Sequence, residues 1–191
     1  MMAVNGDAFV LKQWSTGALV GVIDGLGHGQ CAHQAAQAAW QYVENHFDQP
    51  LETLFRGVGH VCQVTRGVVM ALARFDWHAP LSAFRLTFAS IGNIEAHLLG
   101  SSQPANFIVR RGVVGLHAPV PVITKHHWEP GSVLILHSDG VTTYWRWERF
   151  AHLTRAPATV IAQELLRTLA KDNDDATVAV VKGVEGRQRQ L

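Results

Sequence analysis

Aspartate occurs in four turn-like stretches of the 191-residue chain, each directly before or after an apolar run. The acids are Asp7, Asp24, Asp139 and the pair Asp174–Asp175. A single Asp-Gly dipeptide is weak evidence, because aspartate and glycine are common in ordinary turns. The repetition indicates a shared site. Carboxylates without an organised set of Cys or His favour the oxygen-binding cations Mg²⁺ and Mn²⁺ over zinc or copper.

Two cations of this kind that share one carboxylate support a specific chemistry. They lower the pKa of a bridging water, and they stabilise both the attacking and the leaving oxygen of phosphoryl transfer. The acidic turns therefore predict metal-dependent hydrolysis of a phosphate ester. The spaced glycines after Asp24 do not predict a dinucleotide loop, since the first predicted helix is followed by a second helix and not by a parallel strand.

The elements that must position these acids begin with a predicted hairpin. Residues 8–14 alternate apolar and polar side chains, and residues 18–23 form an apolar run, so both segments are expected to be strands joined by a short turn. Asp7 precedes the first strand and Asp24 follows the second. Antiparallel pairing then places both carboxylates at the same edge of the sheet.

The rest of the chain shows helical and strand patterns in succession. Short connections between the later strands indicate an antiparallel sheet, and the order of elements predicts an α+β fold of two packed sheets flanked by helices. Residues 90–93 are expected to form a tight turn between antiparallel strands, and residues 111–131 a long loop with room for one short strand. Helices are expected at 30–47, 51–64, 146–153 and 158–171, and strands at 67–75, 83–90, 94–99, 105–110, 132–137 and 176–181.

The composition is that of one globular domain, with 48% hydrophobic and 16% charged residues. We expect this domain to span residues 1–183 and to be followed by a flexible tail, residues 184–191. A net charge of +1 gives no signal for nucleic acid or an anionic membrane as partner. Two cysteines, no secretory signal and no apolar segment of roughly 20 residues predict a cytoplasmic protein.

Six short motifs follow one another along nearly the whole chain, in the order in which they occur in one family of enzymes. The sequence resembles the metal-dependent protein phosphatases of the 2C type (PPM), and within them the SpoIIE/RsbX-like bacterial branch. Each motif alone is only moderately specific, and their shared order and spacing carry the resemblance. The motifs lie at residues 5–9, 24–29, 66–67, 90–93, 137–140 and 174–177.

The resemblance implies a four-layer αββα sandwich and a serine/threonine protein phosphatase. The implied substrate is phosphoserine or phosphothreonine on a STAS-domain regulatory protein of a stressosome-like pathway. By the same resemblance, Asp24 bridges two Mn²⁺ or Mg²⁺ ions and Gly25 adds its backbone carbonyl to one of them. Asp139 and Asp174 hold the other ion, with Asp7 beside it, directly or through water. Asp24 and Asp139 are thereby the expected catalytic carboxylates.

The chain departs from the family pattern in two places. Eukaryotic relatives carry a histidine two residues after the bridging aspartate, where this chain has Leu26, and a phosphate-binding arginine that nothing before Asp7 can supply. His28 is a candidate general acid, because imidazole titrates near neutral pH, but an ordinary loop histidine is the alternative. Arg66 and Arg85 are candidates for the phosphate contact, with solvated arginines as the alternative.

These departures leave a second function open. A pseudophosphatase that binds a partner without turnover would tolerate Leu26 and the missing arginine. The retained carboxylates argue against it, because crowded acids repel one another unless a cation is present. Hydrolysis of a small phosphorylated metabolite is a third possibility that the sequence alone does not separate from the first.

Overall fold

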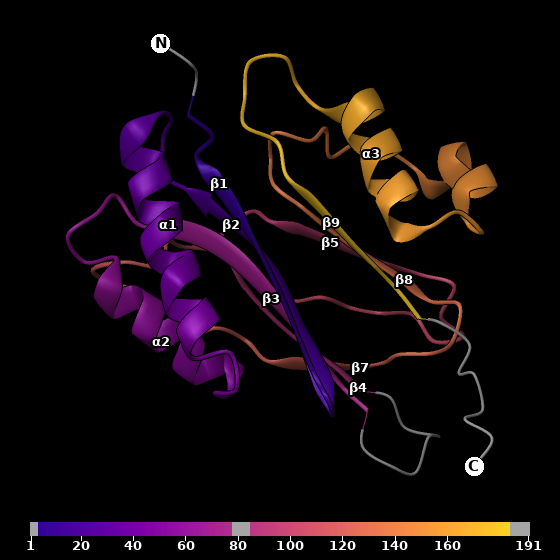
Figure 1. Cartoon of the computed structure of the whole chain (residues 1–191), viewed down its shortest axis with the longest axis horizontal. Coiled ribbons are helices and arrows are strands. Elements are labelled where there is room, and N and C mark those ends of the chain that lie inside the picture. Colours follow the sequence, from indigo (N-terminus) through magenta and orange to yellow (C-terminus); the bar gives the residue numbers. More distant parts are fainter. Residues whose placement is uncertain (1–3, 78–84, 184–191) are drawn as a thin grey trace.

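The computed structural model describes residues 4–77 and 85–183. Two β-sheets pack face to face, with helices α1 and α2 outside one sheet and helix α3 outside the other (Figure 1). This arrangement confirms the expected four-layer α+β sandwich. The predicted tail, residues 184–191, lies outside the described residues. In the described part of the chain, no helix is long and apolar enough to cross a membrane.

Among the described residues, the larger sheet has the strand order β1-β2-β3-β4-β6, with β7 paired to β4. Its neighbouring strands are antiparallel, except for the parallel pair β4 and β6. The smaller sheet has the order β5-β8-β9 and is antiparallel. The strands are β1 Asp7–Trp14, β2 Gly17–Gly25, β3 Val68–Asp76, β4 Arg85–Ile91, β5 Glu95–Leu99, β6 Val109–Arg110, β7 Thr124–His127, β8 Val133–His137 and β9 Val178–Lys182.

The helices end slightly earlier than the sequence pattern predicts. They are α1 Gln30–Asn45, α2 Leu51–Val61 and α3 Ala158–Leu169. Helix α1 buries a stripe of alanines on the larger sheet, and these small side chains allow the helix to pack closely behind the strand that ends in Asp24. The alanine stripe therefore packs α1 against the sheet that carries Asp24.

Three apolar layers hold the sandwich together. Phe55 of α2 packs in the layer behind the larger sheet, and Phe88 and Leu134 meet between the two sheets. Ile161 and Leu165 of α3 pack on the outside of the smaller sheet. All five are essentially buried, and each such side chain contributes about 1.5–3 kcal/mol relative to an exposed one.

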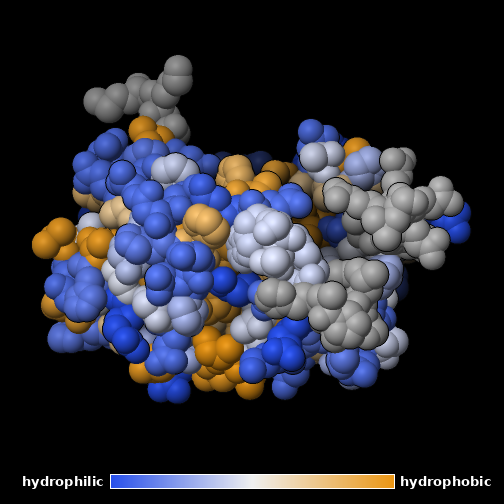
Figure 2. Space-filling view, turned by 60° about the horizontal axis from the view of Figure 1, so that its bottom comes forward, coloured by the Kyte–Doolittle hydropathy of each residue, from blue (hydrophilic) through white to orange (hydrophobic). Residues whose placement is uncertain are grey.

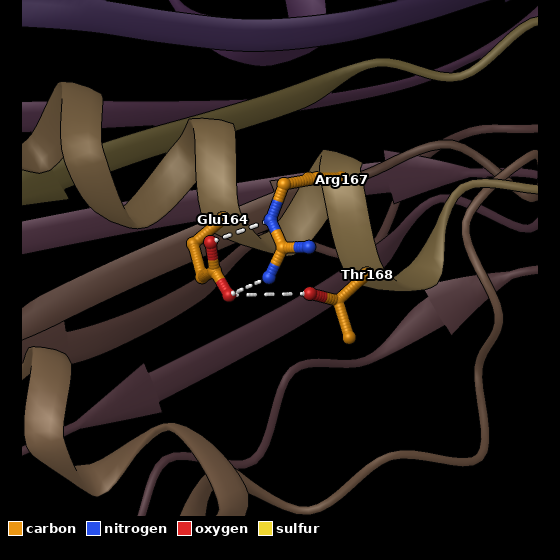
Figure 3. Close-up of polar contacts among 3 residues, drawn as sticks. All are labelled: Glu164, Arg167 and Thr168. Carbon is orange, nitrogen blue, oxygen red and sulfur yellow. Dashed lines mark hydrogen bonds and ion pairs between the residues drawn. The ribbon is translucent and has the colours of Figure 1, made fainter.

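The outer face of α3 is polar. Glu164 and Arg167 form an ion pair one turn apart, and Thr168 donates a hydrogen bond to the same carboxylate (Figure 3). The pair is exposed, so its contribution to stability is below about 1 kcal/mol. The buried apolar side chains Ile161, Leu165 and Leu169 on the opposite face decide which face of α3 points to solvent.

Two predicted segments differ from the structure. Residues 90–93 do not connect two paired strands, because β4 belongs to the larger sheet and β5 to the smaller one; the chain bends at Gly92 and crosses between the sheets. The strand predicted at 105–110 is reduced to Val109–Arg110, which pairs in parallel with β4. Ile108 is 43% exposed, so this apolar run is not anchored in the core.

Two other predictions concern the second half of the chain. The helix predicted at 146–153 is a 3-10 helix, Trp147–Leu153, whose Phe150 and Leu153 are buried against the smaller sheet. The long segment 111–131 contains one short strand, β7, as predicted. The first two residues of the strand predicted at 83–90 lie outside the described residues.

Candidate functional site

The hairpin places two acids opposite each other. Asp7 begins β1 and Asp24 lies at the end of β2, and the two residues are direct partners in the antiparallel register. Partners in such a ladder project from the same face of the sheet. Gly25 N donates a 3.1 Å hydrogen bond to Gly6 O, which continues the pairing past the acids. The predicted proximity of Asp7 and Asp24 is therefore present.

Strand β8 of the smaller sheet brings the next acid to the same place. Ser138 directly follows β8, and its Oγ donates a 2.7 Å hydrogen bond to Asp7 Oδ2. The same Oγ accepts a 2.9 Å hydrogen bond from the backbone N–H of Thr177. One buried hydroxyl thus joins the ends of three segments and holds the two sheets together beside Asp139.

Asp139 is held by two further contacts. Asn93 Nδ2 donates a 2.8 Å hydrogen bond to Asp139 Oδ2, from the point where the chain crosses between the sheets. Lys171 Nζ donates a 2.6 Å hydrogen bond to the backbone carbonyl of Asp139. The carboxylate of Asp139 is therefore oriented by a side chain from a distant part of the sequence.

The last acidic pair separates into two roles. Asp174 is exposed and faces the site, whereas Asp175 Oδ2 accepts a 2.7 Å hydrogen bond from Gly6 N. Gly140 packs against this segment so closely that a Cβ atom there would overlap the carbonyl of Asp175. Glycine is required at this position because two backbones meet there without space for a side chain.

These segments surround a pocket of about 490 Å³, which we call the acidic pocket. Its lining includes Asp24, Asp139 and Asp174, together with Leu26 and Arg111. The pocket lies where the ends of β2, β4 and β8 meet, so residues from both sheets contribute. Asp7, 8% exposed, and Gly25 are not among the residues that line the pocket; Asp7 is the strand partner of Asp24, and Gly25 directly follows Asp24.

Electrostatics in the acidic pocket are unfavourable for the free carboxylates. Burial, and then repulsion from Asp7, Asp139 and the 174–175 pair, raises the pKa of Asp24 to about 8. Burial also raises the pKa of Asp7, to about 6, although the hydrogen bond from Ser138 opposes the shift. Acids that resist ionisation in this way are stabilised by a nearby cation.

The donor chemistry fits a hard divalent cation. The carboxylates of Asp24, Asp139 and Asp174 line the pocket, Asp7 is the strand partner of Asp24, and Gly25 follows Asp24 in the chain. Carboxylate and carbonyl oxygens are the donors that Mg²⁺ and Mn²⁺ prefer. Within residues 4–77 and 85–183, no group of three or more His, Cys, Asp or Glu side chains is close enough together to hold a metal ion as they stand. Mg²⁺ commonly keeps several waters and uses few carboxylates, so an open set is compatible with it.

The other candidate residues lie in different places. His28 is exposed and is not among the residues that line the acidic pocket. Arg66 lies over Gly27 in the loop that follows Asp24, next to the pocket. Arg85 begins β4, whereas the pocket lies beyond the other end of that strand. The structure therefore excludes Arg85 as the phosphate contact and leaves Arg66 near the site.

Sequence reasoning missed three residues of the site: Ser138, Asn93 and Arg111. Ser138 and Asn93 lie inside recognised motifs, and their polarity beside aspartate or glycine was the available signal. Arg111 lies in an irregular segment that has no periodicity to interpret. The pairing of β6 with β4 and the bridge between Val68 and Val114 bring Arg111 to the pocket.

A second large cavity lies at the opposite end of the sandwich. It has a volume of about 660 Å³ and is lined by Trp14, Trp77 and Trp128 and by residues near the end of β9. Figure 2 shows hydrophobic residues as separate patches among hydrophilic ones on the face that it presents. The lining of this cavity includes no aspartate or glutamate among the described residues, so the acidic pocket is the better candidate for metal chemistry.

Several solved structures share this fold. A chain from work on the bacterial stressosome, described as a modular system adapted to control secondary messenger signalling, matches with a TM-score of 0.84 and 26% identity, covering 93% of this chain and 91% of that one. RsbX in complex with magnesium matches with a TM-score of 0.77 and 20% identity, covering 93% of this chain and 90% of that one. The catalytic domain of the phosphatase PstP with two manganese ions matches with a TM-score of 0.70 and 17% identity, covering 97% of this chain and 94% of that one.

Two sequence comparisons gave different results. The comparison with curated proteins gives no match. The model of the family described as Stage II sporulation protein E (SpoIIE) matches residues 15–183. This range includes Asp24, Asp139 and Asp174, and Asp7 lies just before it. The chain therefore belongs to the SpoIIE family.

Proposed function

We propose that this chain is a Mn²⁺- or Mg²⁺-dependent phosphatase that hydrolyses phosphoserine or phosphothreonine on a protein. One observation carries the proposal: acids from both sheets meet at one pocket, where burial and then the neighbouring acids raise the pKa of Asp24 to about 8. A cluster of this kind is costly unless a cation neutralises it. The magnesium and manganese named for RsbX and PstP support the same metals here.

The residues that would hold the cations are those of the acidic pocket. Asp24 is the proposed bridging ligand, with the backbone carbonyl of Gly25, and Asp139, Asp174 and Asp7 complete the donor set, directly or through water. When two such cations are bound, they supply a water of lowered pKa and neutralise charge on the phosphoryl group.

The chain's own residues position and stabilise the reacting groups. Ser138 and Asn93 orient the carboxylates of Asp7 and Asp139. Arg111 lines the pocket and provides the cationic side chain that the family pattern places elsewhere; a guanidinium binds phosphate oxygens well. His28 remains the proposed proton donor to the leaving oxygen, on the loop whose Gly27 lines the pocket.

A phosphorylated regulatory protein of the STAS-domain type is the proposed partner. The similarity to RsbX and to a chain from work on the stressosome supports this choice. The phosphatase domain is proposed to span residues 1–183, and the protein is proposed to act in the cytoplasm.

Phosphate release is the direct test. Purified protein should release phosphate from a phosphoserine peptide and from para-nitrophenyl phosphate when Mn²⁺ is added, and chelation should stop the reaction. Asp24→Ala and Asp139→Ala should each lower kcat at least about 100-fold, whereas Asp48→Ala, which removes an exposed acid outside the pocket, should not. Metal-independent activity, or activity that survives both pocket substitutions, would refute the proposal.

A binding protein without turnover is the second candidate. Leu26 at the pocket wall and the open metal set favour it. Calorimetric titration with Mn²⁺ separates the two candidates. Absence of binding at millimolar metal would favour the pseudophosphatase, and binding together with turnover would exclude it. Parallel assays on phosphopeptides and sugar phosphates distinguish a protein substrate from a metabolite.

A further inference from the structure

A second depression adjoins the acidic pocket and has the opposite electrostatic character. It has a volume of about 400 Å³, and its lining includes Arg66, Arg111, Leu116 and His117. We call it the basic groove. Arg111 and Gly112 line both the basic groove and the acidic pocket, so the two depressions adjoin.

The fold places both arginines at this boundary. Leu26 N donates a 3.0 Å hydrogen bond to Gly67 O, which joins the loop after Asp24 to the residue that follows Arg66. The Arg66 guanidinium lies over Gly27, which itself lines the acidic pocket. On the other side, Gly92 N donates a 2.9 Å hydrogen bond to Arg110 O and so holds the strand that precedes Arg111.

The two arginines of the groove have no ion-pair partner among the described residues. The lining of the groove also contains no aspartate or glutamate in residues 4–77 and 85–183. Leu116 is 66% exposed beside the arginines, which offers an apolar contact as well. A surface of this kind complements an extended segment that carries negative charge.

We propose that the basic groove binds the polypeptide that flanks the phosphorylated residue and selects substrates with acidic side chains there. This inference rests on the proposed phosphatase function. With the phosphoryl group in the acidic pocket, residues one to three positions away reach the groove, since an extended chain advances about 3.3 Å per residue. Arg66 pairs with a flanking carboxylate, and Arg111 lies between that carboxylate and the phosphoryl group.

The test uses matched phosphoserine peptides with glutamate or lysine at the three positions on either side. For the wild-type protein, kcat/KM should favour the glutamate peptide about fivefold, as expected for exposed charge pairs. Arg66→Gln should reduce this ratio to about 1–2, and Arg66→Glu should invert it. The preference should weaken from about 0.05 M to about 0.5 M salt, because salt screens exposed charges.

Arg110→Gln is the matched control. It removes an exposed arginine of the same charge next to Arg111, but Arg110 lines neither depression. This variant should keep the fivefold ratio. If Arg110→Gln and Arg66→Gln lower the ratio equally, general surface charge explains the preference and the groove assignment is wrong.

A binding measurement separates the failure of this inference from the failure of the proposed function. Fluorescence anisotropy with the same peptides, carrying a non-hydrolysable phosphonate in place of phosphate, reports the groove without turnover. If para-nitrophenyl phosphate and the peptides are hydrolysed but the glutamate and lysine peptides react equally, only the groove proposal fails. If nothing is hydrolysed, the phosphatase proposal fails, and equal affinity for the two phosphonate peptides overturns the groove proposal as well.

Discussion

Ser138 Oγ donates a 2.7 Å hydrogen bond to Asp7 Oδ2 across a sequence separation of 131 residues. Both residues are buried, and the same hydroxyl accepts from Thr177 N. The contact joins the first strand of one sheet to the strand ends of the other. The geometry of the acidic pocket therefore depends on how the two sheets pack and not only on which acids the chain carries.

Removing this hydroxyl should cost both stability and activity. Ser138→Ala leaves the buried Asp7 carboxylate and the Thr177 N–H without their partner, which should lower the free energy of unfolding by about 1–3 kcal/mol in urea denaturation. Because Ser138 orients a proposed metal ligand, kcat/KM should fall about 10- to 100-fold.

Ser132→Ala is the matched control for this substitution. Ser132 is equally buried but directly precedes β8, at the end of the strand away from the acidic pocket, where its Oγ accepts a hydrogen bond from Glu129 N. The Ser132→Ala variant should be less stable than the wild type but should keep the wild-type kcat/KM. Equal loss of activity in the two variants would show that destabilisation, and not the orientation of Asp7, is responsible.

The raised pKa values of Asp24 and Asp7 predict that the metal-free protein is less stable at higher pH. Each group has an ordinary pKa of 3.8 in the unfolded chain, against about 8 and about 6 in the folded protein. These two carboxylates make the folded state bind more protons between about pH 4 and pH 8, which lowers stability as pH rises. Burial lowers the pKa of His97 to about 4 and also lowers the pKa of His137, which has the opposite effect below about pH 6.5. Thermal unfolding of the chelated protein should therefore show Tm falling from pH 6.5 to pH 8.5.

Asp24→Asn tests the origin of that pH dependence. It removes the most strongly shifted carboxylate, so Tm without metal should be about 3 °C or more above the wild type at pH 8 and close to it at pH 4.5. Mn²⁺ should raise the Tm of the wild type but not that of the variant, since binding to the native state alone stabilises it. A variant that is less stable than the wild type at pH 8 would contradict the repulsion in the acidic pocket.

Asn93 should influence metal affinity without being a ligand. Asn93→Ala frees the carboxylate of Asp139 from its 2.8 Å hydrogen bond, and the Mn²⁺ concentration for half-maximal activity should rise about 10-fold or more. Asn106→Ala, in an exposed loop, should leave that concentration unchanged. An unaltered metal requirement in Asn93→Ala would mean that the hydrogen bond does not position Asp139 for metal.

A proton donor is needed most when the leaving group is poor, and this tests His28. His28→Ala should lower kcat for phenyl phosphate about 100-fold and for para-nitrophenyl phosphate far less, because general acid catalysis typically contributes 10²–10⁴-fold. His60→Ala, which removes a histidine from helix α2, should affect neither substrate. Equal effects of His28→Ala on both substrates would exclude His28 as the general acid.

The sequence by itself determined the acids, most strands and the pairing of Asp7 with Asp24. That pairing was predictable because a short hairpin turn sets the register locally, so no distant contact was needed. The order of elements likewise predicted two packed sheets flanked by helices, and the resemblance to the 2C-type phosphatases implied the four layers. These features depend on residues that are close together in the chain.

Only the tertiary structure decided which side chains donate hydrogen bonds to the acids and which arginine lies beside them. The hydrogen bonds of Ser138 and Asn93 join distant segments, and Arg111 reaches the pocket from an irregular segment through the pairing of β6 with β4. Local periodicity contains no information about such contacts. The same holds for the bend at Gly92, where a predicted hairpin turn proved to be the crossing between the two sheets that places Asn93 beside Asp139.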